Sequence, residues 1–370
     1  MLRGLALGAA TLSSPALQAR SQLLDISANA LDLQLPARRI VLGDGPLAYV
    51  VALLQEGDPF RHIVGWADNF RAADLDGYQA FSRRFPYIDS IPTFRGSNVG
   101  AIDAELALSL QPDVVVLNLS SQAAAQSSGF SERLQRAGVP LLYVDFRTQM
   151  QENTEQSLRI IGALLGQSER AEAFISMRRQ HLQLIHQRLL SERSRPRVMI
   201  ERAAGLYDDC CLSYGDGNFG QLLEAAGARN IAKPLLHGAF GTLHPEQVIA
   251  SEPDVILVTG ANWSLYSPAG DWVNLGPGAD PNEGRQRLQR LMQRPAYRSL
   301  EAVRAGRVYA IWHPFYDHPC HFIALQRIAK WLHPTLFHDL DPDATFAQVH
   351  QRFLPLPYQP GYWLNLERYP

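Results

Sequence analysis

The side chains best suited to bind a ligand follow the apolar segments that predict β-strands. In the first half of the chain, Asn118 comes directly after the apolar segment 114–117, and Arg95 lies in a Phe-Arg-Gly turn. In the second half, the corresponding positions are Arg202, Tyr214, Trp263, His313 and Tyr316. Guanidinium and aromatic groups recognise anionic and flat molecules better than they recognise a bare metal ion. We therefore expect a bulky ligand, partly anionic and partly flat, where these segments end.

Histidines offer a second kind of chemistry, because the run 313–321 contains His313, His318 and His321. A metal site between the two halves would need ligands from both, and the only histidine before residue 153 is His62, which adjoins the start of a predicted strand. This disfavours direct capture of zinc or manganese. The sequence has no G-x-S-x-G motif and no Ser, His and acid arrangement, so hydrolytic catalysis lacks a candidate.

The chain has three cysteines, Cys210, Cys211 and Cys320. Adjacent cysteines bridge each other only through a strained small ring, so we expect any structural disulfide to join Cys320 to one of the pair, provided that their Cα atoms lie within about 7 Å. The vicinal pair lacks the C-x-x-C spacing of a metal site. The sequence leaves open whether a disulfide forms.

Two segments of similar sequence organise the rest of the chain. Residues 103–118 read DAELALSLQPDVVVLN, and residues 244–259 read HPEQVIASEPDVILVT. Each predicts a short helix, a Pro-Asp turn and a buried strand. The two segments align without a gap, so that Glu105, at the start of one helix, coincides with Glu246 at the start of the other.

A helical segment, residues 151–193, separates the two copies. Asn153 and Gln156 resemble a capping box, and Gly166 ends the first helix before a longer one begins at Ser168. We expect this segment to be a rigid spine between two lobes, residues 20–150 and 194–370, with a ligand cleft between them.

Strands that alternate with helices predict an α/β fold in which each lobe has a mainly parallel sheet flanked by helices. We expect a hairpin over residues 24–35. Residues 67–100 show no clear periodicity and predict a long connection on the cleft side. The tail from Pro355 predicts an irregular extension.

Composition and charge restrict the function further. The 370 residues favour two domains, and a net charge of −2 without a basic cluster disfavours nucleic acid as a partner. Residues 1–19 resemble a signal peptide, with Arg3 before a mostly apolar stretch and Ala19 at its end. No later stretch reaches the roughly 20 apolar residues that span a bilayer. We expect an exported, soluble, periplasmic monomer.

A family resemblance rests on motifs that occur in a fixed order: LPARRIVLG, RHIVGWA, IDAELALSLQPDVVVLN, AGVPLLYVDF, LHPEQVIASEPDVILVTG and RVYAIWHPFY. The chain resembles the periplasmic binding proteins of ABC importers for ferric siderophores, haem and cobalamin, in the helical-spine (TroA/FecB-like) class. Glu201-Arg202-Ala203-Ala204-Gly205 and Cys210-Cys211 make it most similar to iron-complex receptors. The resemblance implies a receptor that is not an enzyme and has no intrinsic cofactor. Such a receptor delivers an iron chelate to an inner-membrane ABC permease.

The resemblance also implies roles for particular residues. The ligand would contact Arg95, Arg202, Tyr214, Trp263, His313 and Tyr316, and iron within the chelate could contact His313 or Tyr316. Glu105 and Glu246 match positions that pair with arginines of the permease, although helix capping is an alternative role for both. Haem is the main alternative ligand, because Tyr214 or His313 could be its axial ligand. A bare metal ion is disfavoured as the ligand. Two further alternatives are an enzyme of the same bilobed fold that holds a metal cluster on the Cys pair, and a sensor or partner-binding module that transports no small molecule.

Overall fold

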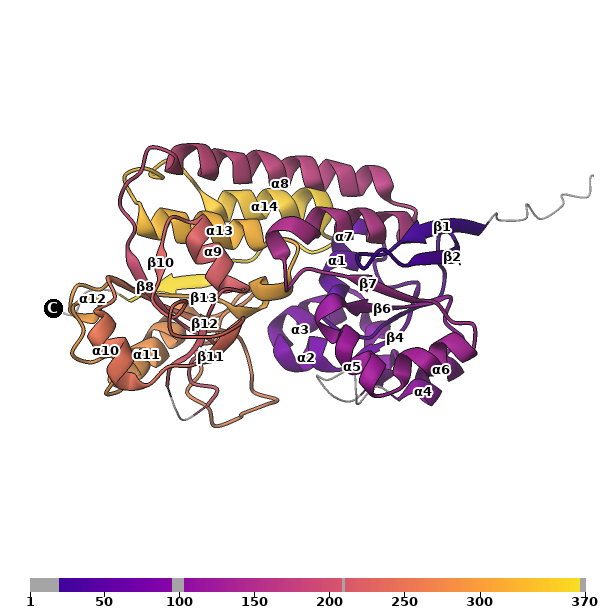
Figure 1. The fold of residues 1–370 in the computed structure, drawn as a ribbon, viewed down its shortest axis with the longest axis horizontal. Helices are drawn as coiled ribbons and strands as arrows, with labels where there is room; N and C mark the ends of the chain where they lie inside the picture. The colour runs from indigo at the N-terminus through magenta and orange to yellow at the C-terminus, as the bar shows by residue number, and fades with distance from the viewer. Residues whose placement is uncertain (1–19, 95–102, 208–209, 367–370) are drawn as a thin grey trace, which may run out of the picture.

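The computed structural model describes residues 20–94, 103–207 and 210–366, so the expected signal peptide lies outside the described residues. Two α/β lobes lie side by side, and two long helices run along the top of the molecule (Figure 1). This arrangement confirms the predicted fold class. None of the described helices combines the length and apolarity required to span a bilayer.

The N-terminal lobe contains a parallel five-stranded sheet in the order β5-β4-β3-β6-β7. The strands are β3 (Ile40–Leu42), β4 (Ile63–Ala67), β5 (Thr93–Phe94), β6 (Val114–Asn118) and β7 (Leu141–Val144). Every residue of β6 is buried, as expected for an apolar strand covered by helices on both faces. The predicted hairpin is present but begins earlier than residue 24, with strands β1 (Arg20–Leu24) and β2 (Ala30–Gln34).

The C-terminal lobe contains a seven-stranded sheet that is parallel at its centre and antiparallel at its edges. Its strands are β8 (Arg197–Glu201), β9 (Leu212–Tyr214), β10 (Arg229–Asn230), β11 (Phe240–Thr242), β12 (Val255–Gly260), β13 (Val308–Trp312) and β14 (Trp363–Asn365). Strand β14 pairs antiparallel with β13, so the tail is not wholly irregular as predicted.

The remaining helices cover these sheets. They are α1 (Leu47–Leu54), α2 (Asn69–Ala73), α3 (Leu75–Arg84), α4 (Ala104–Ser109), α5 (Gln122–Ser127), α6 (Phe130–Arg136), α9 (Phe219–Ala225), α10 (Pro245–Ser251), α11 (Pro281–Leu291), α12 (Glu301–Arg304), α13 (His321–Leu332) and α14 (Pro342–Phe353), with 3-10 turns η1 (Pro86–Ser90), η3 (Leu119–Ser121) and η4 (His313–Asp317). The prediction of a long connection over residues 67–100 was wrong, because α2 and α3 occupy its first half. Asp74 starts α3 by accepting a hydrogen bond from the Gly77 amide at 3.3 Å.

The two copies of the repeated segment make the same backbone contacts in both lobes. Asp113, in the Pro-Asp turn before β6, accepts a hydrogen bond from the Arg39 amide at 2.9 Å, and its own amide donates to the Arg39 carbonyl at 2.7 Å. Asp254, in the turn before β12, makes both contacts with Arg197, each at 2.8 Å. Each turn therefore fixes the start of the neighbouring strand.

The helical spine consists of α7 (Met150–Leu165) and α8 (Ser168–Leu189). Gly166 ends α7 with φ of 68°, as predicted. The predicted capping box was wrong, because α7 begins at Met150 and Asn153 instead donates a hydrogen bond to Asp145 at 2.9 Å.

One cluster of buried hydrophobic side chains extends through both lobes and the spine. It includes Val50 of α1, Ile161 of α7 and Val258 of β12. A smaller cluster, which includes Val115, packs on the other face of the N-terminal sheet. The lobes and the spine therefore share most of their apolar core.

Direct contacts also join the lobes below the spine. Arg147, three residues after β7, forms ion pairs with Asp44 of its own lobe at 3.1 Å and with Asp317 of the other lobe at 2.6 Å. In addition, Trp263 Nε1 donates to the carbonyl of Ala73 at 3.1 Å. The lobes are therefore held together close to the carboxyl ends of their strands.

Arg147→Met is expected to destabilise the protein by about 3 kcal/mol at neutral pH, because it leaves buried carboxylates without a partner. Burial raises the pKa of Asp317 to about 6, although Arg147 acts to lower it. A carboxyl whose folded-state pKa is raised gives stability at low pH that is lost as the pH rises through about 6. The cost of the substitution should therefore be smaller at pH 5 than at pH 8, as measured by urea unfolding.

The matched control is Arg159→Met, because Arg159 pairs with the exposed Glu172 at 2.6 Å. This change should cost little at either pH. An equal loss for Arg147→Met at both pH values would contradict the assigned role of Asp317.

Candidate functional site

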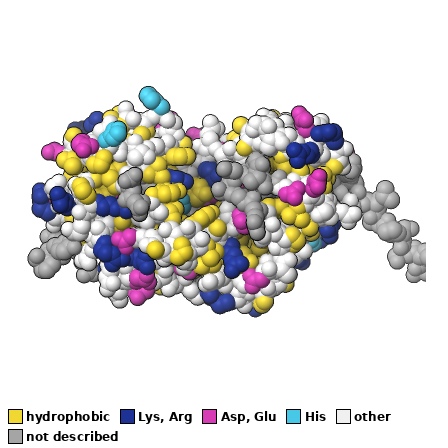
Figure 2. Space-filling model, turned by 90° about the horizontal axis from the view of Figure 1, so that it is seen from below, with side chains coloured by type: hydrophobic (Ala, Val, Ile, Leu, Met, Phe, Trp, Pro, Cys, Tyr) yellow, Lys and Arg dark blue, Asp and Glu magenta, His cyan; other side chains and the backbone are white. Residues whose placement is uncertain are grey.

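A cavity of about 430 Å³ lies between the lobes at the carboxyl ends of the strands. Figure 2 shows the molecule hollowed between its two lobes on this face. The cavity is lined by Asn69, Ala73, Arg202, Ala203, Leu206, Tyr207, Trp263, Tyr266, Ser267, His313 and Tyr316. Four of the predicted ligand contacts, Arg202, Trp263, His313 and Tyr316, thus meet at one site. No Asp or Glu belongs to the described lining.

Arg202 supplies the positive charge of this cavity. It directly follows β8, and its guanidinium lies 4.8 Å from the centre of the Phe240 ring. Among the described residues, no carboxylate lies within ion-pair distance of Arg202. Arg147, in contrast, is neutralised by two carboxylates. Arg202 is therefore the group best placed to attract an anion.

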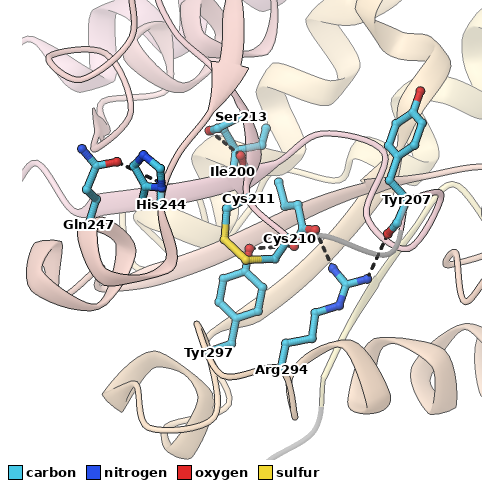
Figure 3. Close-up of a disulfide and its surroundings, with 10 residues drawn as sticks. Ile200, Tyr207, Cys210, Cys211, Ser213, His244, Gln247, Arg294 and Tyr297 are labelled. Atoms are coloured by element: carbon cyan, nitrogen blue, oxygen red, sulfur yellow. Dashed lines mark hydrogen bonds and ion pairs between the residues drawn. A yellow bond between two sulfur atoms is a disulfide. The ribbon is translucent and has the colours of Figure 1, made fainter.

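A buried carboxylate fixes the chain next to Arg202. Glu201 is 2% exposed, and it accepts hydrogen bonds from Arg294 Nη1 at 2.8 Å and from the Tyr297 hydroxyl at 2.6 Å. Arg294 also donates to the carbonyl of Tyr207, a residue of the cavity lining, at 3.5 Å (Figure 3). Burial raises the pKa of Glu201, while Arg294 and Tyr297 oppose that effect. Glu201 thus holds the segment that carries Arg202 and Tyr207.

A disulfide joins Cys210 and Cys211 within this segment (Figure 3). The expectation that Cys320 would be the partner was wrong, because Cys320 is a free, buried cysteine at the start of α13. Cys211, which directly precedes β9, has a φ of 85°. The Arg202 amide then donates to the carbonyl of Leu212 at 2.7 Å, which closes the segment into a loop.

His313 is a neutral polar group of the cavity wall. Burial lowers its pKa well below the usual value, and the nearby Arg202 and Arg147 lower it further. Its Nδ1 lies 2.8 Å from the hydroxyl of Thr259, so Nε2 is the nitrogen left for a ligand. Trp263 packs against the imidazole with its ring centre 5.3 Å away.

Tyr316 connects the cavity to the ion pairs between the lobes. Arg147 stacks 4.9 Å from the centre of the Tyr316 ring and donates to its hydroxyl at 3.3 Å. Burial raises the pKa of Tyr316 well above the usual value, so the phenol stays protonated. We did not predict Arg147 as a site residue, although it follows β7 as closely as other site residues follow their strands.

The other predicted ligand contacts are not among the described lining residues of this cavity. Tyr214 is 2% exposed and packs on Phe219, outside the lining of the cavity. Asn118 is 1% exposed, and its side chain accepts a hydrogen bond from the Ser120 amide at 3.5 Å at the start of η3. Arg95 lies outside the described residues. In the described part of the chain, no group of three or more His, Cys, Asp or Glu side chains is placed to hold a metal ion.

Glu105 and Glu246 lie in the first turns of α4 and α10, and both are exposed. Figure 1 places these helices low on their lobes, on the side away from α8. Other residues supply the caps: Asp103 accepts from the Glu105 amide at 2.9 Å, and Gln247 accepts from the His244 amide at 2.9 Å. Neither glutamate side chain is therefore needed as a hydrogen-bonding cap.

Sequence comparison relates most of the chain to one family. The profile of the periplasmic binding protein family matches residues 82–313. Comparison with curated protein sequences gave no match.

Several solved structures share the fold over nearly their whole length. The TroA-like periplasmic binding protein FepB from Veillonella parvula is 24% identical, with a TM-score of 0.83 over 94% of this chain and 99% of that one. The molybdate-binding protein MolA from Haemophilus influenzae, bound to molybdate, is 18% identical, with a TM-score of 0.70 over 92% and 99%. A periplasmic haem-binding protein from Pseudomonas aeruginosa is 20% identical, with a TM-score of 0.56 over 81% and 94%. Likeness at these identities shows the fold and leaves the ligand open.

Glu201→Gln is expected to destabilise the protein by about 1–3 kcal/mol, because Arg294 loses its buried anionic partner. The matched control is Asp271→Asn, which removes the anion of the exposed pair with Arg290, at 2.6 Å. This control should cost less than about 1 kcal/mol. Urea unfolding measures both values, and equal losses would show that Glu201 does not fix the segment.

Proposed function

Because the chain belongs to the periplasmic binding protein family, we propose that it binds a ferric siderophore in the cavity between its lobes and passes it to an ABC permease. Proteins of this family are the substrate-binding components of ABC importers. The siderophore and its iron are the proposed cargo.

The observation that carries the proposal is the charge of Arg202 in an aromatic cavity, where neither the described lining nor the described surroundings of Arg202 place a carboxylate against it. Among the described lining residues, a divalent cation would meet a guanidinium and no carboxylate, which is unfavourable. A small oxyanion would contact Arg202 but would leave the aromatic side chains of Tyr207, Trp263 and Tyr266 without a ligand contact. A negatively charged iron chelate with flat organic groups uses both features.

Haem is a second candidate, and His313 is the observation that favours it. Its Nε2 is free of the hydrogen bond to Thr259, and a neutral imidazole is a common axial ligand of haem iron. Haem also carries carboxylates that Arg202 could bind. The position of His313 at the cavity wall suits either an axial ligand or a contact with an iron chelate.

A fluorescence titration of purified protein with ferric siderophores, iron-free siderophores, molybdate and haem tests the proposal. A ferric siderophore should quench Trp263 with a Kd of about micromolar or tighter. Arg202→Ala should weaken that binding about tenfold or more, because a charge-assisted contact is lost. The matched control is Arg298→Ala, an exposed arginine of the same lobe, which should bind like the parent.

Two results would overturn the proposal. If haem binds with an absorbance band that disappears in His313→Ala, the ligand of the cleft is haem and not a ferric siderophore. Saturable binding of molybdate alone would show that the site takes a small oxyanion.

We propose that Glu105 and Glu246 dock the protein onto the permease. They occupy equivalent positions in the two lobes, and exposed charges at an interface act mainly on orientation and association. A permease built from two related subunits would meet one glutamate with each subunit.

The variant Glu105→Ala/Glu246→Ala should keep ligand affinity within about twofold and lose most uptake through the cognate permease. The control is Glu132→Ala/Glu301→Ala, which removes an exposed first-turn glutamate from a helix of each lobe. The control should transport normally. A loss of thermal stability in the first variant would support a helix-dipole role, and normal uptake by a stable protein would exclude docking.

A further inference from the structure

A second cavity of about 290 Å³ lies at the junction of the lobes and shares no lining residue with the cleft. We call it the junction cavity. Its walls come from α1 and α3 of the N-terminal lobe, which Figure 1 shows on one side of the junction, and from β13, α14 and the tail of the other lobe. The lining includes Tyr49, Ala80, Phe81, Trp312, Phe346 and Tyr362.

The walls of the junction cavity are mostly uncharged and are rich in aromatic side chains. Tyr362 makes ring contacts with Phe346 and Trp312, with centres 4.7 Å and 5.1 Å apart. Burial lowers the pKa of His318 to about 3 and that of His350 to about 4, so both imidazoles are neutral. Aromatic walls favour edge-to-face contacts with another flat ring. Since a cavity of about 150 Å³ holds benzene, this one has room for two fused rings.

Two polar features of the lining indicate which substituent a bound aromatic ring would have. Arg83 and Arg84 line the cavity and are exposed, and no carboxylate lies within ion-pair distance of either among the described residues. Asp76 is a nearby acid: its carboxylate accepts a hydrogen bond from Asn262 at 2.7 Å, and burial raises its pKa while the charge of Arg83 acts to lower it without forming an ion pair. His350 bonds to the carbonyl of Leu356 through Nδ1 at 3.0 Å, while its buried Nε2 has no partner in the described part of the chain.

We propose that the junction cavity is a second ligand site, which binds a small aromatic carboxylate. The fused rings lie among Tyr49, Trp312 and Tyr362, and the carboxylate pairs with Arg83 and Arg84. The proposal goes beyond the proposed transport function and does not depend on which ligand the cleft takes. Because both lobes supply walls, an occupant contacts both lobes at once.

Isothermal titration of the full chain with 2-naphthoate tests the proposal. The parent should bind one equivalent. Ala80→Phe, which fills the cavity from the surface of α3, should weaken binding at least about tenfold, while Gln79→Phe, at the neighbouring exposed position outside the lining, should bind like the parent. Arg202→Ala should also bind like the parent, because Arg202 lines only the cleft.

Arg83→Gln/Arg84→Gln tests the charge separately. These side chains are exposed, so the variant should fold, and circular dichroism checks this for every variant. It should bind 2-naphthoate about threefold to tenfold more weakly than the parent, whereas the neutral 2-naphthalenemethanol should bind both proteins equally. Absence of saturable binding to the folded parent would overturn the proposal. So would binding that is lost in Arg202→Ala but unchanged in Ala80→Phe, because the probe would then occupy the cleft.

Discussion

The cleft depends on one shared guanidinium, that of Arg147. It forms ion pairs with Asp44 and Asp317, which belong to different lobes, and stacks on Tyr316. These partners lie at or near the ends of strands, where an α/β sheet places its ligand. The same contacts that hold the lobes together therefore also orient one wall of the cavity. A buried ion pair of this kind specifies an arrangement more than it adds stability, because desolvation offsets much of the attraction.

The two arginines near the cavity have separate tasks because their surroundings differ. Arg147 is neutralised and positions other groups, whereas Arg202 packs against the face of Phe240 and forms no ion pair with a described carboxylate. Glu201, the residue before Arg202, forms its ion pair with Arg294 and not with Arg202. At the end of this strand, the negative charge of Glu201 thus pairs with Arg294, while the positive charge of Arg202 faces the cavity, where a ligand can bind it.

The sequence predicted features that depend on periodicity and on strand ends. The buried strands, the Gly166 helix end and the meeting of Arg202, Trp263, His313 and Tyr316 follow from rules that act locally. The sequence did not predict α2 and α3, because short helices carry too few turns to show a period. It also missed that Asn118 turns inward to cap η3, since the direction of a side chain at a strand end depends on the turn that follows.

The vicinal disulfide was missed for a similar reason. Steric preference disfavours a bridge between neighbours, yet Cys210 and Cys211 form one, and Cys211 has a positive φ. Sequence spacing does not report that conformation. Cys320, the alternative partner, is held in the core by the packing of α13. The sequence predicted this helix but not the residues that pack around it.

The continuous hydrophobic cluster has a consequence for how such proteins can diversify. The repeated segments show that the two lobes share a plan, yet their buried side chains and those of α7 pack into one core. A lobe grafted from a relative would thus need matching spine residues, because a mismatch would open voids beneath the helices. Ligand specificity can change more easily through the loops at the strand ends, which line the cleft and leave the shared core intact.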